Sequence, residues 1–210
     1  MSKVKVEKIV MGMYQTNCYY AYLEDSKDII VVDPADSGEY LFDLFTEKGF
    51  KVSAILLTHG HFDHIYGVKA LKELSGAKVY AFSDESRLLS DEDLNCSVSL
   101  SGRSVRLEAD TLLSDGEMIT LAGMDISVIH TPGHTEGSAS FYIEEEGLLF
   151  SGDTLFSGSV GRSDLPTGNG RTLINSIKDK LMVLPPDVRV FPGHGDETTI
   201  GFERKYNPFL

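Results

Sequence analysis

The segment over residues 58–64 holds three of the six histidines in the chain, together with an aspartate. The apolar run before it predicts a buried strand that ends where these side chains begin. In near-extended backbone, His59 and His61 lie two steps apart, with about 6–7 Å between their Cα atoms. Both imidazoles can therefore reach one metal ion, while Asp63 and His64 face a second. The alternative is a polar loop with a chance cluster of histidines, which the density of ligand-type residues disfavours.

Three more candidate ligands occur downstream, and each follows a glycine at the end of a strand-like run. Glycine permits a tight turn and a close approach of backbones, and strand C-termini are where ligands bind in layered α/β folds. Five imidazoles and two carboxylates suit two metal ions with one bridging carboxylate. This donor set suits Zn, Fe or Mn better than Cu(I) or Mg, and we expect two divalent ions with zinc as the first choice. The seven candidates are His59, His61, Asp63, His64, His134, Asp153 and His194.

The elements that must position these residues are strands and helices in both halves of the chain. Hydrophobic periodicity and turn residues predict strands over 4–13, 17–24, 28–33, 52–57, 77–81, 117–121, 124–130, 138–144, 147–151 and 188–191. They predict helices over 38–48, 63–75, 171–183 and 197–205. Because no linker separates the halves, we expect one domain, 1–210, with two sheets face to face and helices outside.

The pattern weakens between residues 84 and 110, where acidic residues and serines predict a short helix and a long surface loop. A run of acidic residues is usually a solvated face, and we favour that interpretation. The other interpretation is a lid over the metal site.

Composition excludes several classes of function. The net charge of −13 and the absence of Lys and Arg clusters argue against nucleic acid as a partner. The same charge argues against an anionic membrane surface. Because the N-terminus is charged, we expect no signal peptide and no membrane span, and the two cysteines suggest no disulfide framework. We expect a cytoplasmic enzyme with a small-molecule substrate, and the oligomeric state stays open.

The order and spacing of four motifs resemble the metallo-β-lactamase superfamily over essentially the whole chain. These motifs are His-x-His-x-Asp-His at 59–64, Thr-Pro-Gly-His-Thr at 131–135, Ser-Gly-Asp-Thr at 151–154 and Pro-Gly-His-Gly at 192–195. Two early segments, Thr-Asn-Cys-Tyr at 16–19 and Val-Asp-Pro-Ala at 32–35, also resemble the opening of that family.

The resemblance implies an α+β fold, a four-layer αββα sandwich with a dinuclear metal site at one edge. It also implies how the seven candidates are shared between the ions. The first ion would be bound by His59, His61 and His134. The second would be bound by Asp63, His64 and His194, with Asp153 bridging the two.

Within the superfamily, residues 155–164 and 203–210 resemble the short form of the glyoxalase II-like hydroxyacylglutathione hydrolases. This implies hydrolysis of a thioester, such as an S-2-hydroxyacyl-glutathione, by a metal-bridging hydroxide that forms because the metals lower the pKa of water to about 7. A thiolate leaves without a general acid because thiols have a pKa near 8.5. Asp63 is expected also to orient the hydroxide. Two departures concern glutathione: the chain ends where glyoxalase II continues into a helical domain, and Asp164 stands where that family has an aromatic residue.

An anionic substrate of an acidic protein needs local cations. The candidates are Arg162, Arg204 and Lys205, and the alternative for each is ordinary surface charge.

Other activities remain open on the sequence. A persulfide dioxygenase of the same superfamily would use a single iron on His59, His134 and Asp153. A lactonase or true β-lactamase is more remote, because the commonest lactamase type places an arginine where His64 stands and a cysteine where Asp153 stands.

Overall fold

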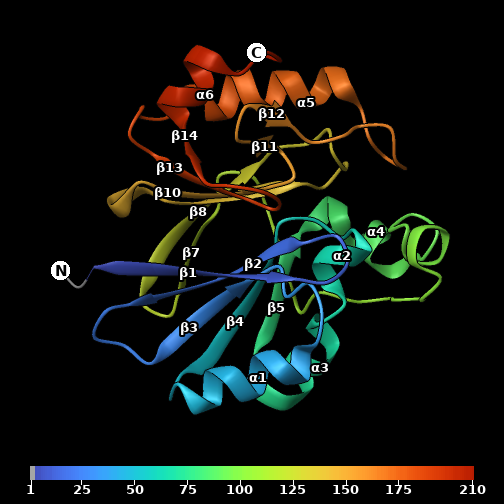
Figure 1. Cartoon of the computed structure of the whole chain (residues 1–210), viewed down its shortest axis with the longest axis vertical. Coiled ribbons are helices and arrows are strands. Elements are labelled where there is room, and N and C mark those ends of the chain that lie inside the picture. Colours follow the sequence, from blue (N-terminus) through green and yellow to red (C-terminus); the bar gives the residue numbers. More distant parts are fainter. Residues whose placement is uncertain (1–2) are drawn as a thin grey trace.

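The computed structural model describes residues 3–210 as four layers. Two sheets pack face to face, and helices cover the outer face of each sheet (Figure 1). The expected α+β four-layer αββα sandwich is therefore confirmed. No helix in this range is long and apolar enough to span a bilayer.

The first half of the chain builds one sheet and its helices. Its elements are β1 (Val4–Met11), β2 (Thr16–Leu23), β3 (Asp28–Val32), α1 (Gly38–Glu47), β4 (Lys51–Leu57), α2 (Phe62–Ile65), α3 (Val68–Ser75), β5 (Lys78–Phe82), α4 (Ser86–Ser90) and β6 (Thr111–Leu113). The strands follow one another in the sheet in chain order, from β1 to β6. Helices α1 and α3 cover its outer face (Figure 1).

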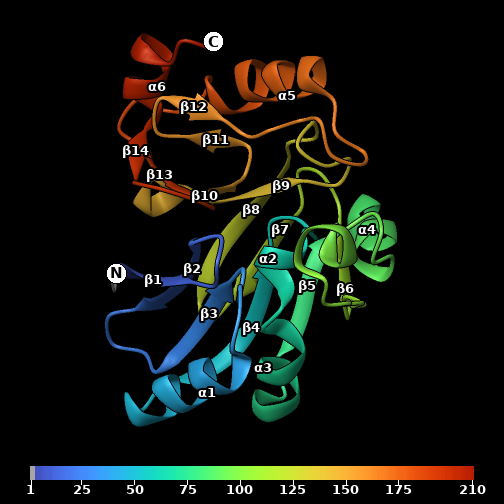
Figure 2. The same cartoon turned by 45° about the vertical axis from the view of Figure 1, so that its right-hand side comes forward.

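The second half repeats this plan. Its elements are β7 (Met118–Leu121), β8 (Met124–His130), β9 (Ala139–Ile143), β10 (Leu148–Gly152), β11 (Leu155–Phe156), β12 (Ser159–Val160), α5 (Gly170–Ser176), β13 (Arg189–Pro192), β14 (Thr198–Thr199) and α6 (Ile200–Tyr206). The second sheet has the order β14-β13-β10-β9-β8-β7, and β11 with β12 forms a separate hairpin. This hairpin lies between the second sheet and its outer helices (Figure 2).

Strand direction in the second sheet decides where its loops emerge. Strands β8 and β10 are both antiparallel to β9, so they run the same way, and β13 is parallel to β10. The C-terminal ends of β8, β10 and β13 therefore meet at one edge. The loops that carry His134, Asp153 and His194 follow these three ends.

Aromatic side chains lie at the centre of contacts between the two sheets, within a largely aliphatic core. Tyr19 of the first sheet packs against Phe150 and Phe191 of the second, with ring centroids 5.7 and 5.5 Å apart. Phe141 is fully buried in the same cluster. Two further clusters fill the spaces between each sheet and its helices, so all four layers are joined by apolar contacts.

The single helix expected over 63–75 is wrong: the structure has two helices, α2 and α3, with a break at Gly67. The Gly67 N–H donates to Pro34 O at 2.8 Å. An added Cβ at Gly67 would lie 2.6 Å from Asp36 O, so the chain in front of α1 passes directly over the break. The strands β6, β11, β12 and β14 were not predicted, because two or three residues are too few to show a period.

The segment over 84–110 holds α4, a wider turn at Ser97–Ser101 and an extended run into β6. Asp84, Asp91 and Asp93 are exposed, as a solvated face requires. The prediction of a solvated face is wrong for Glu85, because only 1% of its surface is exposed.

Candidate metal centre

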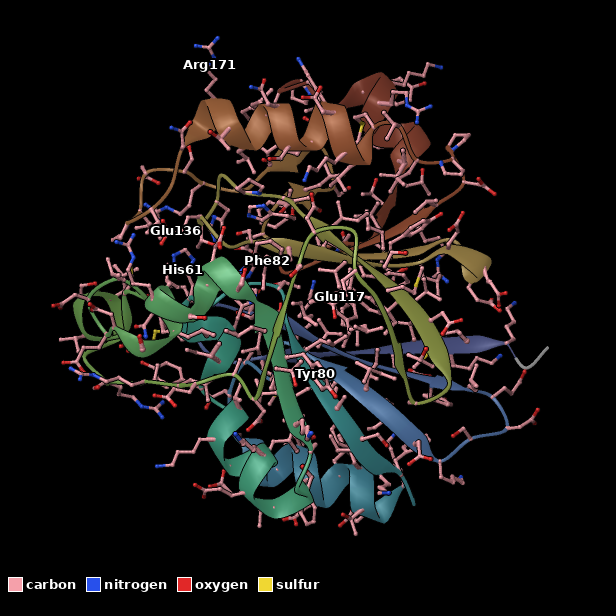
Figure 3. The ribbon with its side chains drawn as sticks, turned by 180° about the vertical axis from the view of Figure 1, so that it is seen from behind. His61, Tyr80, Phe82, Glu117, Glu136 and Arg171 are labelled. Carbon is pink, nitrogen blue, oxygen red and sulfur yellow. The ribbon has the colours of Figure 1, made fainter. Side chains whose placement is uncertain are left out.

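The candidate ligands gather where the edges of the two sheets meet. Four of them follow β4 of the first sheet: His59, His61, Asp63 and His64, the last two on α2. The loops after β8, β10 and β13 of the second sheet supply His134, Asp153 and His194. Backbone hydrogen bonds join the sheets here: Ala139 N–H donates to Thr58 O at 2.8 Å and Asn17 N–H to Gly193 O at 2.7 Å. Viewed from behind, His61 lies at this junction, below Glu136 of the second half (Figure 3).

Three buried imidazoles converge to form a first group. His134 Nε2 lies 2.8 Å from His61 Nδ1 and 3.2 Å from His59 Nε2. Burial, assisted by neighbouring imidazoles, holds the pKa of His59 and of His61 well below the usual value. His134 Nδ1 donates to Arg162 O at 2.7 Å, which leaves Nε2 as the free acceptor. Neutral imidazoles with converging lone pairs are what a divalent transition metal requires.

A second group is formed by Asp63, His64 and His194. His194 Nε2 lies 3.4 Å from both Asp63 Oδ2 and His64 Nε2. Burial opposes protonation of His64, but the nearby carboxylates of Asp153, Asp63 and Asp33 outweigh it and raise its pKa to about 10. The position between these side chains therefore attracts positive charge.

Asp153 lies between the two groups. Its Oδ2 is 3.6 Å from His134 Nε2 of the first group and 3.5 Å from His194 Nε2 of the second. Its Oδ1 is buried without a hydrogen-bond partner among the described residues, and so is His61 Nε2. A buried carboxylate oxygen without a donor is costly unless a cation satisfies it. The residues therefore fit two cations that share Asp153.

Two of the glycines that precede ligands are required by close packing. An added Cβ at Gly193 would lie 2.1 Å from Asp153 Oδ1 and 2.7 Å from His64 Cε1. Gly133 has φ +134°, and an added Cβ there would lie 2.2 Å from Leu173 N. The glycines thus allow the ligand loops to approach one another, as the sequence predicted.

Asp33 supports the second group from behind, a role that sequence reasoning missed. One carboxylate oxygen, Oδ2, lies 2.9 Å from His64 Nδ1 and accepts the Thr58 hydroxyl at 2.6 Å. The other accepts the Thr58 N–H at 2.8 Å. Asp33 also lies close enough to His59 and His64 to form a third group of possible ligands. Because both oxygens already accept hydrogen bonds, Asp33 orients His64 instead. Its only sequence signal was the family-like segment over 32–35.

Glu85 is a second supporting residue that was missed. It accepts the N–H of Gly60, which lies between His59 and His61, at 2.7 Å. Its other oxygen accepts the hydroxyl of Thr135, which follows His134, at 3.0 Å. Burial raises the pKa of Glu85 to about 7. One side chain thus connects the two loops that carry the first group.

Asp63 has a partner of its own. Thr16 donates its hydroxyl to Asp63 Oδ2 at 3.0 Å. Burial would raise the pKa of Asp63, but the imidazoles of His64 and His194 hold it well below the usual range. Asp63 is therefore ionised and acts as an acceptor.

A cavity of about 370 Å³ opens over the histidines. The three candidate substrate contacts differ in whether they line it. Arg162 lines it, but its guanidinium is held by both oxygens of Asp164, at 2.8 and 2.9 Å. Arg204 and Lys205 lie on α6 and do not line this cavity. Arg204 donates to Leu184 O at 2.7 Å, and Lys205 lies over the Tyr206 ring. The expectation that these two residues join the site is not supported by their positions.

The sequence model of the metallo-beta-lactamase superfamily matches residues 11–194. Probable metallo-hydrolase YqgX of Bacillus subtilis is 38% identical over 208 residues, which cover 99% of this chain and 98% of that protein. Hydroxyacylglutathione hydrolase GloC of Haemophilus influenzae is 34% identical over 216 residues, with 99% and 98% coverage.

Solved structures agree with the sequence relatives. The crystal structure of BLEG-1 B3 metallo-beta-lactamase has a TM-score of 0.94 and 41% identity, and the match covers 98% of this chain and 99% of that one. TTHA1623 in a di-iron-bound form has a TM-score of 0.86 and 38% identity, with 97% and 100% coverage. The fold and the ligand cluster define a metallo-hydrolase, and the chain belongs to the metallo-β-lactamase superfamily.

Proposed function

We propose that the chain is a dinuclear metal-dependent thioester hydrolase acting on substrates such as S-2-hydroxyacyl-glutathione. The observation that carries the proposal is the pair of complete ligand groups with Asp153 between them. The name of the GloC relative, which matches over nearly its whole length, supports the thioester. Zinc is the first candidate metal, and the di-iron form of a neighbour supports iron as another.

The candidate ligands have distinct roles in the proposed reaction. His59, His61 and His134 would hold one ion, Asp63, His64 and His194 would hold the other, and Asp153 would be shared by both. Bound divalent ions of this kind lower the pKa of a water molecule and polarise a carbonyl oxygen. Asp63, whose carboxylate is ionised, would accept a hydrogen bond from the attacking water and orient it.

The expected leaving group needs no general acid. A thiol has a pKa near 8.5, so the sulfur leaves as a thiolate and needs no proton donor. The cavity lining includes the apolar side chains of Phe156, Val160 and Leu165. Such a lining strengthens electrostatic interactions inside the site.

A second candidate is β-lactam hydrolysis. It is favoured by the likeness to BLEG-1, at 41% identity and a TM-score of 0.94. The persulfide dioxygenase needs only one ion, and the complete second group, Asp63 with His64 and His194, counts against it.

The test measures three reactions with the metal-loaded protein: thiol release from a panel of acyl thioesters, ring opening of a chromogenic cephalosporin, and oxygen uptake with glutathione persulfide. We expect the thioesters to be cleaved most efficiently. His194→Asn should lower kcat/KM at least about 100-fold, because it removes a ligand. His130→Asn is the matched control, since His130 stacks on Phe82 at 4.0 Å, outside the cluster. Oxygen uptake without thioester cleavage, or cephalosporin cleavage alone, would overturn the proposal.

A further inference from the structure

A second cavity, of about 420 Å³, lies beside the metal centre. It shares Tyr14, Phe62, Asp63 and Leu100 with the cavity over the histidines, so the two adjoin on either side of a ligand residue. The Tyr14 hydroxyl donates to Leu100 O at 3.2 Å and marks the boundary between them. A substrate whose reacting carbonyl lies at the metal centre can therefore extend in two directions.

The two cavities differ in charge. In the cavity over the histidines, Arg162 is already paired with Asp164. In the second cavity, the guanidinium of Arg103 lies 4.5 Å over the Tyr66 ring. None of the ion pairs found among residues 3–210 involves Arg103, so its guanidinium is not paired with a carboxylate as that of Arg162 is. A stacked guanidinium of this kind binds a carboxylate in a two-pronged geometry.

Tyr66 fixes the segment that carries Arg103 beside the cavity. The Tyr66 hydroxyl donates to Arg103 O at 2.7 Å and also contacts the Ser101 hydroxyl. These contacts anchor the chain after the turn at Ser97–Ser101 to the link between α2 and α3. Tyr66 thus holds the backbone of Arg103 through its hydroxyl and contacts the guanidinium through its ring, although the arginine side chain itself is exposed.

Asp36 lines the same cavity and gives it a second charge of opposite sign. The lining thus holds one arginine, two aspartates (Asp36 and the candidate ligand Asp63) and the aromatic rings of Phe62 and Tyr66. Such a lining suits a group that carries both a carboxylate and an ammonium. In a protein with net charge −13, a carboxylate needs such a local cation to bind at all.

We propose that the second cavity binds the thiol-carrier half of the substrate, an amino-acid-type thiol whose carboxylate is bound by Arg103. The acyl half then occupies the cavity over the histidines, where the lining is largely apolar and Arg162 is neutralised. This assignment rests on the proposed thioester hydrolysis, and it makes Arg103 a residue that determines which carrier is accepted.

The experiment compares two thioesters with one acyl group: S-lactoylglutathione, whose carrier bears carboxylates, and S-lactoyl-N-acetylcysteamine, whose carrier is neutral. We expect Arg103→Gln to raise KM for the first about 10-fold or more, with kcat little changed, because a hydrogen-bonded charge pair is lost. KM for the neutral thioester should stay the same, and Arg103→Lys should recover part of the loss. Arg106→Gln is the matched control, since Arg106 is exposed on the same segment and pairs with Glu92 at 3.2 Å. An equal effect of Arg103→Gln on both thioesters, or no effect, would overturn the assignment.

A binding measurement separates this inference from the proposed function. Isothermal titration calorimetry with S-methylglutathione, which is not a thioester, reports on the carrier cavity without turnover. Weaker binding by Arg103→Gln than by Arg106→Gln would support the cavity even if neither thioester is hydrolysed. Equal binding by the two variants, or no binding by the unmodified protein, would overturn it even if thioesters are cleaved.

Discussion

The two ring nitrogens of His64 have different partners. This difference shows how Asp33, which is not a candidate ligand, acts on His64, which is. Nδ1 lies 2.9 Å from Asp33 Oδ2, while Nε2 faces Asp63, Asp153 and His194. A carboxylate on the far nitrogen fixes the tautomer and raises the basicity of the ligating nitrogen. Asp33 thereby determines which nitrogen of His64 is presented to a metal.

We expect Asp33→Asn to lower the affinity for one of the two metal ions about 10–100-fold and to leave the other nearly unchanged. The backbone should tolerate the change, because Asp33 has φ 51° and asparagine adopts that region readily. Competition with a chromophoric chelator measures both affinities. Asp125→Asn is the control, since Asp125 is exposed and contacts Thr120. Unchanged affinity for both ions would show that Asp33 has no such role.

At this scale the sequence predicted the seven candidate ligands but not the residues that support them. The ligands stand in short motifs next to glycines, so their spacing is visible in one dimension. Glu85 is 25 residues from Gly60 and 50 from Thr135, and it lies within an acidic run that is otherwise solvated. Only the packing of the 3-10 turn at Ser83–Glu85 against both ligand loops reveals its role.

At the scale of elements, Glu85 connects the loop after β4 to the loop after β8. Its pKa of about 7 lies above the ordinary value of 4.5. Between these two values the unfolded chain loses the proton first, so it binds fewer protons than the folded chain. Stability contributed by this group is therefore present below about pH 4.5 and is lost as the pH rises towards and through 7.

We expect Glu85→Gln to reduce this pH dependence. The free energy of unfolding of the metal-free protein, measured in urea at pH 5 and pH 8, should fall less with pH in the variant than in the unmodified chain. The difference should be on the order of 3 kcal/mol. Glu145→Gln is the control, because Glu145 is exposed on the turn between β9 and β10. The same pH dependence in Glu85→Gln and the unmodified protein would contradict the buried, proton-binding role.

Most longer strands were predicted because their apolar pattern is set by burial within a single segment. The break at Gly67 could not be predicted, since its cause is the passage of Pro34 and Asp36 over the helix. The hairpin of β11 and β12 is also set by its surroundings, where Gly158 N–H donates to the buried Glu203. Local hydrophobic periodicity does not predict elements that are fixed by contacts with residues distant in the sequence.

At the scale of the whole molecule, the contact between the sheets determines whether the ligand loops meet at all. First-group residues His59 and His61 come from one sheet, whereas His134 comes from the other. The core between the sheets therefore contributes to metal binding as well as to folding. The order of strands and helices predicted two sheets face to face with helices outside, and the family resemblance specified the four-layer αββα sandwich.

We expect Phe141→Ala to lower the free energy of unfolding by about 3–5 kcal/mol, since Phe141 is fully buried between the sheets. Urea denaturation with zinc in excess measures the loss. Phe209→Ala should cost far less, because 53% of the Phe209 surface is exposed. Equal costs for the two variants would show that the sheet interface does not dominate stability.

The most direct test of the account is the number of bound metal ions per chain at which thioester hydrolysis saturates. Chelator-treated protein is titrated with zinc, and bound metal and thiol release are measured on the same samples. We predict that activity reaches its maximum at two ions per chain, because both groups and the shared Asp153 are needed. Full activity at one ion per chain, or no thioester hydrolysis at two, would contradict it.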